Sequence, residues 1–156
     1  MGQKAIWIGS TIAFTGVVSL GLWLFSNLFV AGESSGTEAI AEFQHLTDTP
    51  AAATSALSTS NAHFLVVVAG IDPSFFFKFQ TNQHFIDALV AQHQLELTST
   101  DAEVCQDVIT HGPIRPWWNA WMHSFNQCYV GYSNGDIYHL LFDSNSGVMF
   151  LYLADT

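Results

Sequence analysis

The residues of this sequence best suited to covalent chemistry are its two cysteines, Cys105 and Cys128. In an oxidising compartment, a chain with two cysteines usually joins them in a disulfide bond. We therefore expect a structural disulfide; two free buried thiols, or a redox or metal role, are the alternatives. A catalytic dithiol has no support, because the CxxC spacing of such sites does not occur.

The seven histidines raise the question of a metal or catalytic site. No two of them have the HxxxH or HExxH spacing of metal ligands on one helix face, and no P-loop or GxGxxG motif is present. Asp101, Glu103 and Asp107 cluster at the start of a predicted helix, where acids are favoured by the helix dipole. We predict no catalytic, cofactor-binding or metal-binding residue and no cofactor.

The most aromatic stretch is RPWWNAWMHSF, residues 115–125. If a helix starts at Pro116, four apolar side chains fall on one stripe that would plug the core, namely Trp118, Trp121, Met122 and Phe125. Trp117, Arg115 and His123 lie off that stripe. They are the candidate contact surface, for a protein, a carbohydrate or the bilayer.

The charge balance excludes one class of partner. Acidic residues outnumber basic ones 13 to 3, and the formal net charge is −10. Proteins that bind nucleic acid neutralise phosphates with Lys and Arg, so we expect no nucleic-acid partner.

The first thirty residues predict a membrane anchor. Residues 5–31 contain no charged side chain, and a helix of that length spans the hydrocarbon core of a bilayer. Lys4 precedes the run, which places residues 1–4 in the cytoplasm and the rest across the membrane. A cleaved signal peptide ending near Ala31 is the alternative. We expect a single-pass protein of the bacterial cytoplasmic (inner) membrane, bound to lipid through residues 5–31, with an extracytoplasmic C-terminal domain.

The remaining chain divides into a linker and a domain. Residues 32–61 are rich in Ser, Thr, Ala and Gly, which is typical of a flexible linker, although TEAIAEFQHL within them has the pattern of a short helix. Residues 62–156 have the size and apolar content of one folded domain.

The pattern within residues 62–156 predicts an α+β fold. Apolar runs at 63–70 and 75–80 predict two strands, and helices are expected after Thr81 or Asn82 and from Thr100. Asn134-Gly135 predicts a tight hairpin turn, and SNSG the next turn, which together give a three-stranded C-terminal antiparallel meander. We expect this sheet with two to three short helices packed on it.

Both faces of the predicted meander are apolar. One carries Tyr129, Tyr138, Leu140 and Phe142, and the other Val130, Tyr132, Ile137, His139 and Leu141. An antiparallel sheet with one face in water alternates apolar and polar residues instead. Either two layers cover this sheet, or one face docks on a partner.

Three segments carry a resemblance to a known type of protein: FFFKFQTNQHFIDALVAQHQLEL, RPWW and YHLLFDSNSGVMFLYLA. The chain over residues 62–156 resembles small bacterial membrane-anchored or exported α+β proteins. No activity accompanies that resemblance, so it implies the domain boundary alone.

Together these observations predict a non-catalytic interaction or accessory protein at the membrane. Its expected partner is another protein or a second copy of the chain. The alternative is a small extracytoplasmic hydrolase or carbohydrate-binding enzyme that uses Asp and His near the tryptophans. A structural assembly factor is a third hypothesis.

Overall fold

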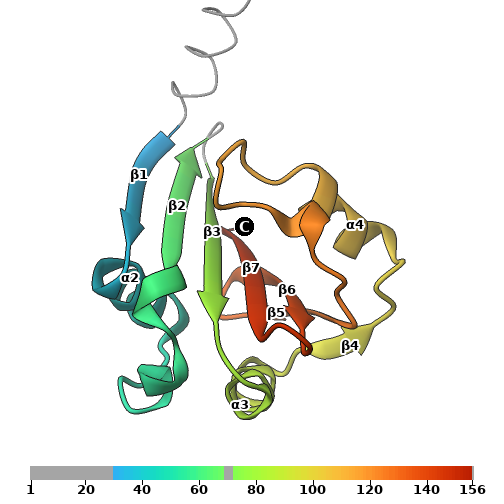
Figure 1. Cartoon of the computed structure of the whole chain (residues 1–156), viewed down its shortest axis with the longest axis horizontal. Coiled ribbons are helices and arrows are strands. Elements are labelled where there is room, and N and C mark those ends of the chain that lie inside the picture. The colour runs from blue at the N-terminus through green and yellow to red at the C-terminus, as the bar shows by residue number, and fades with distance from the viewer. Residues whose placement is uncertain (1–29, 69–71, 156) are drawn as a thin grey trace, which may run out of the picture. The chain divides into compact units, whose positions relative to one another are not determined.

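A computed structural model of the chain describes residues 30–68 and 72–155 (Figure 1). Among these residues, no helix combines the length and the apolar character that crossing a membrane requires. The predicted cytoplasmic residues 1–4 and the predicted anchor, residues 5–31, lie outside the described residues, except that Val30 and Ala31 belong to the first strand.

The described residues form one antiparallel sheet with strand order β1-β2-β3-β7-β6-β5-β4 (Figure 1). The strand bounds are β1 Val30–Ser35, β2 His63–Val68, β3 Pro73–Gln80, β4 Glu96–Thr98, β5 Gln127–Ser133, β6 Asp136–Asp143 and β7 Val148–Asp155. The last strand, β7, lies in the middle, between β3 and β6.

Three α-helices pack on this sheet, as expected for the predicted α+β class. Helices α2 (Thr37–Thr47) and α3 (Gln83–His93) bury apolar residues against one face. Helix α4 (Glu103–Thr110), together with residues 111–126, packs against the other face around Leu141 and Phe150.

The segment predicted to be a flexible linker, residues 32–61, is instead an ordered part of the domain. It supplies the edge strand β1 and helix α2, whose Ala39 and Phe43 are fully buried. An edge strand is held by backbone hydrogen bonds that do not depend on apolar side chains, and the Phe43 ring packs edge-on against Phe77 at 5.4 Å. The domain therefore includes residues 31–61 as well as the predicted 62–156.

The C-terminal meander has the predicted strands and turn. Asn134 and Gly135 both have positive φ, 56° and 97°, and Ser133 pairs with Asp136 across them. Layers pack on both faces of the meander, since Leu140 belongs to the cluster with α2 and α3 while Leu141 belongs to the cluster with α4. A second layer thus covers Leu141, whereas Val130, Tyr132, Ile137 and His139 of the same face remain partly or largely exposed.

Candidate functional site

Residues 111–126, which we call the tryptophan segment, run over the sheet face opposite α2 and α3. The predicted helix from Pro116 is wrong, because the only helical turn in the segment is a 3₁₀ turn at Ala120–Met122. The predicted stripe is therefore broken. Trp118 is fully buried, whereas 64% of Trp121 and 71% of Met122 are exposed.

Trp118 fills the space between the tryptophan segment and the sheet. Its ring meets Phe76 and Phe150 edge-on, at centroid distances of 5.3 and 4.9 Å. Gly112 makes room for the indole, because a Cβ at that position would lie 1.8 Å from the ring nitrogen of Trp118. The expectation that this tryptophan is a core plug is confirmed.

Two of the predicted contact residues are held by one carboxylate. Glu33 of β1 accepts a hydrogen bond from the indole nitrogen of Trp117 at 2.8 Å and one from Arg115 Nε at 3.1 Å. The Trp117 ring also stacks on His63, with centroids 5.2 Å apart and planes 6° apart. The indole N–H of Trp117 and the Nε–H of Arg115 thus bond within the chain, and one face of the Trp117 ring is covered by His63.

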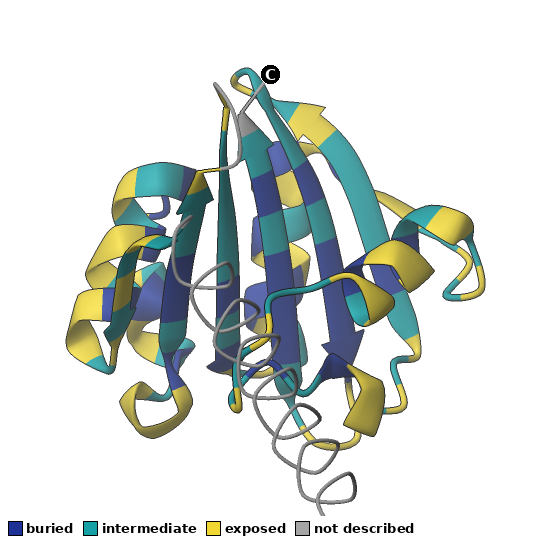
Figure 2. Cartoon of the chain, turned by 90° about the horizontal axis from the view of Figure 1, so that it is seen from above, coloured by how far each residue is buried: buried dark blue, intermediate teal, exposed yellow. Residues whose placement is uncertain are grey.

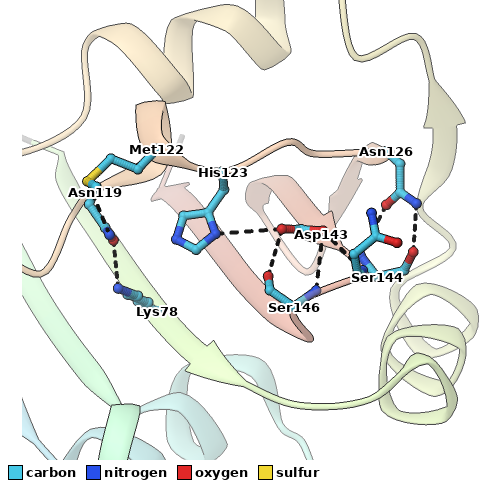
Figure 3. Close-up of polar contacts among 9 residues, drawn as sticks. Lys78, Asn119, Met122, His123, Asn126, Asp143, Ser144 and Ser146 are labelled. Carbon is cyan, nitrogen blue, oxygen red and sulfur yellow. Dashed lines mark hydrogen bonds and ion pairs between the residues drawn. The ribbon is translucent and has the colours of Figure 1, made fainter.

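Lys78 of β3 anchors the middle of the segment (Figure 3). Its ammonium group donates to the carbonyl oxygen of Trp117 at 3.0 Å and to Asn119 Oδ1 at 2.6 Å, and it lies 5.4 Å from the centroid of the Phe150 ring. Burial lowers the pKa of Lys78 below its usual value. The residues on either side of Trp118 are therefore tied to the sheet, Trp117 through its carbonyl and Asn119 through its side chain.

The third predicted contact residue, His123, lies 3.7 Å from the carboxylate of Asp143 (Figure 3). Burial alone would raise the pKa of Asp143, but hydrogen bonds from the Ser146 hydroxyl at 2.6 Å and from the amides of Asn145 and Ser146 lower it overall. The serine hydroxyl donates to the carboxylate and not to the histidine. This network caps the β6–β7 turn and pairs no nucleophile with a base.

Residues 32–36, GESSG, have the GxSxG spacing of a hydrolase nucleophile, which is a second place to look for catalysis. A nucleophile of that type stands on a sharp turn between strand and helix, with its hydroxyl exposed. Ser34 instead lies within strand β1, and its buried hydroxyl has no hydrogen-bond partner among the described residues. The motif match is therefore one of spacing alone.

The two sulfur atoms of Cys105 and Cys128 lie 1.99 Å apart, at disulfide distance. Both residues are fully buried in the cluster that contains Trp118. Helix α4, which leads into the tryptophan segment, is thereby joined to β5, which follows it.

Comparison of the chain with known proteins finds no similar protein. No family model, no curated protein and no solved structure matches the chain. Within residues 30–68 and 72–155, no group of three His, Cys, Asp or Glu side chains is arranged to hold a metal ion.

Within the tryptophan segment, Trp121 and Met122 are exposed residues that the sequence did not single out for contact. Ile114, in the same segment, is also 84% exposed. The sequence carries no clear signal for this. Pro113 and Pro116 restrict only the residues before them, 112 and 115, which precede the predicted helix, and proline is common at the first position of a helix.

Proposed function

We propose that this chain is a non-catalytic interaction protein of the bacterial cytoplasmic membrane, and that it binds another protein through Trp121 and Met122. The observation that carries the proposal is the exposure of these two large apolar side chains on a segment that Lys78 ties to the sheet through Trp117 and Asn119. Tryptophan is enriched among the residues that dominate binding energy at protein interfaces. A lone exposed aromatic side chain is common on protein surfaces, but Trp121 is followed directly by Met122, whose side chain is also largely exposed.

The ordered segment favours binding. Lys78 holds Asn119, two positions before Trp121, and the 3₁₀ turn includes both Trp121 and Met122. Because the segment is already ordered, association would lose less conformational entropy than it would with a flexible loop.

Sequence evidence supports the membrane location. The uncharged run at residues 5–31 ends within β1, and a cysteine pair at disulfide distance is typical of an oxidising, extracytoplasmic compartment. The net charge of −10 favours a partner whose surface around its apolar pocket is neutral or basic. The alternative, a hydrolase or carbohydrate-binding enzyme, lacks comparable support. Asp143 accepts hydrogen bonds within the β6–β7 turn, and His123 lies beside that carboxylate.

The test uses the full chain carrying a photo-crosslinking amino acid, p-benzoylphenylalanine, at position 121 or at position 97. Leu97 is the matched control, since it is an apolar residue of β4 that is 67% exposed. We expect one protein to be crosslinked from position 121 and not from position 97. That protein is then purified, and its Kd is measured for the wild type, Trp121→Ala and Leu97→Ala.

We expect Trp121→Ala to weaken binding at least tenfold, as the loss of a central aromatic anchor does, and Leu97→Ala to leave the Kd unchanged. Equal crosslinking from both positions, or a Kd that Trp121→Ala does not change, would refute the proposal.

A further inference from the structure

A cavity of about 460 Å³ lies beside the tryptophan segment, on the same face of the sheet. Side chains of the central strands form its floor, and α4 with the residues that follow it forms one wall. Val67, Phe76 and Val108 supply apolar surface. Its volume is within the range of small-molecule binding sites.

The cavity exists because the tryptophan segment covers only part of this face. Toward the end of β7 the central strands change from buried to partly exposed residues (Figure 2). Phe150 of β7 and its pairing partner Leu141 of β6 are fully buried. The pair two residues further along these strands, Tyr152 and His139, is only partly buried. The uncovered part of the sheet is the floor of the cavity.

Three polar groups lie among the apolar ones. The hydroxyl oxygens of Ser74 and Tyr152 are 3.4 Å apart, which is long for a hydrogen bond. His139 packs on the Tyr152 ring with centroids 5.4 Å apart, and its Nδ1 atom is buried without a hydrogen-bond partner among the described residues. A buried polar atom without a partner costs free energy, which a suitable ligand would recover.

The charges around the cavity disfavour an anion. Among the described residues, neither Lys nor Arg lines it: Lys78 is held by Asn119, and Arg115 by Glu33. The ionisable side chains of its wall are Asp107 and His111, which lie 3.3 Å apart and are largely exposed. Burial lowers the pKa of His139, although Asp107 opposes the effect, so burial favours a neutral imidazole.

We propose that this cavity binds an uncharged aromatic molecule that carries one O–H or N–H donor. Its rings pack against Phe76, Tyr152 and Val108, and its donor bonds to the imidazole of His139, which turns to present Nδ1 to the cavity. Aromatic rings favour the offset and edge-on contacts that Phe76 and Tyr152 offer. A cavity of this size accepts roughly ten to twenty non-hydrogen atoms. The proposal is independent of partner binding through Trp121.

The test is photolabelling of the full chain in mild detergent with three probes of one skeleton. 4-(Hydroxymethyl)benzophenone is uncharged and carries a donor, benzophenone lacks the donor, and 4-benzoylbenzoate adds a negative charge. Labelled residues are mapped by mass spectrometry, so that labelling of the cavity is distinguished from labelling of the apolar N-terminal residues or of Trp121.

We expect saturable labelling of cavity residues by 4-(hydroxymethyl)benzophenone, and at least tenfold less by 4-benzoylbenzoate. Ser74→Phe, which fills the floor, should reduce the cavity labelling at least tenfold. Leu97→Phe adds the same ring on β4, outside the cavity, and should not change it. Both variants are checked by thermal unfolding, and Val67→Phe replaces Ser74→Phe if the latter does not fold.

The role of His139 has its own readout. In the wild type, 4-(hydroxymethyl)benzophenone should saturate at a lower concentration than benzophenone, and in His139→Phe this difference should disappear. Labelling confined to Trp121 or to the N-terminal residues, equal labelling by the anionic probe, or equal effects of Ser74→Phe and Leu97→Phe would overturn the proposal.

Discussion

Glu33 explains why the residues that the sequence marked for contact differ from the ones that are exposed. Arg115 and Trp117 both bond to this carboxylate, which belongs to a strand that the sequence pattern did not reveal. Side-chain direction follows from the actual backbone, and the backbone here consists of turns and irregular structure in place of the predicted α-helix. Trp121, four positions after Trp117, is therefore the exposed indole of the segment.

A single buried histidine should make stability depend on pH. His93 is 2% exposed and stacks on Tyr138 with centroids 4.5 Å apart. Burial lowers the pKa of His93, against the opposing effects of Thr47 and Asp48. The unfolded chain then binds a proton more readily than the folded one, so the contribution of His93 to stability is complete above about pH 6.5 and is lost as the pH falls through its folded pKa.

We expect the free energy of unfolding, measured by urea denaturation, to fall between pH 7.5 and pH 5.5. His93→Gln should reduce this fall while lowering stability at pH 7.5 by about 1–3 kcal/mol, because buried ring contacts are lost. Part of the fall should remain, since burial also lowers the pKa values of His63 and His139. His45→Gln, on the exposed side of α2, is the control. A pH dependence that is the same in both variants would contradict the assignment.

Among the elements, those specified by local signals were predicted and those specified by distant contacts were not. Asn82 caps α3 by accepting the amide of Phe85 at 3.1 Å, and Asn134-Gly135 makes the β5–β6 turn. Both signals act within a few residues of the chain. Strand β1 is an edge strand whose partner β2 comes about thirty residues later, and pairing of that kind leaves little mark on composition.

Helix α2 shows how few apolar residues can order a polar segment. Ala39 and Phe43 stand one helical turn apart and face the core, while Thr47, at the next turn, is buried with its hydroxyl bonded to the Phe43 carbonyl at 2.6 Å. Threonines that are counted as linker composition are thus buried and satisfied by hydrogen bonds. Amino-acid composition does not show that the buried residues of this segment recur at every turn of a helix.

Phe43→Ala tests whether this segment belongs to the cooperative domain. Removing a fully buried aromatic side chain should lower the free energy of unfolding by about 3–5 kcal/mol. Glu42→Ala, at the neighbouring exposed position, should change it by less than about 0.5 kcal/mol. The measurement is urea denaturation followed by tryptophan fluorescence. If residues 32–61 were a linker, the two variants would behave alike.

At the scale of the whole molecule, the two faces of the sheet differ in how they are covered. Two helices of eleven residues each cover one face, and this produces the larger core cluster. In the part of the chain that the structure describes, the other face receives one helix of eight residues and an irregular segment, which cover it incompletely. Both proposed binding features, the exposed Trp121 and the cavity at His139, lie on this second side, because incomplete coverage leaves aromatic side chains accessible.

The link between Cys105 and Cys128 should therefore matter for this face more than for the rest of the domain. Its sequence separation of 23 corresponds to about 3 kcal/mol of stabilisation in the chain-entropy model, so Cys105→Ser with Cys128→Ser should lower the free energy of unfolding by about that amount.

In the double variant, the tryptophan segment also loses the covalent link between α4, which precedes it, and β5, which follows it. Its amides should then exchange with deuterium faster than those of β3 and β7, which keep all their ladder bonds. Urea denaturation and hydrogen exchange of the oxidised wild type and the double variant measure the two effects. An increase in exchange spread evenly over the sheet and the segment would show that the bridge stabilises the whole domain and does not hold this segment in place.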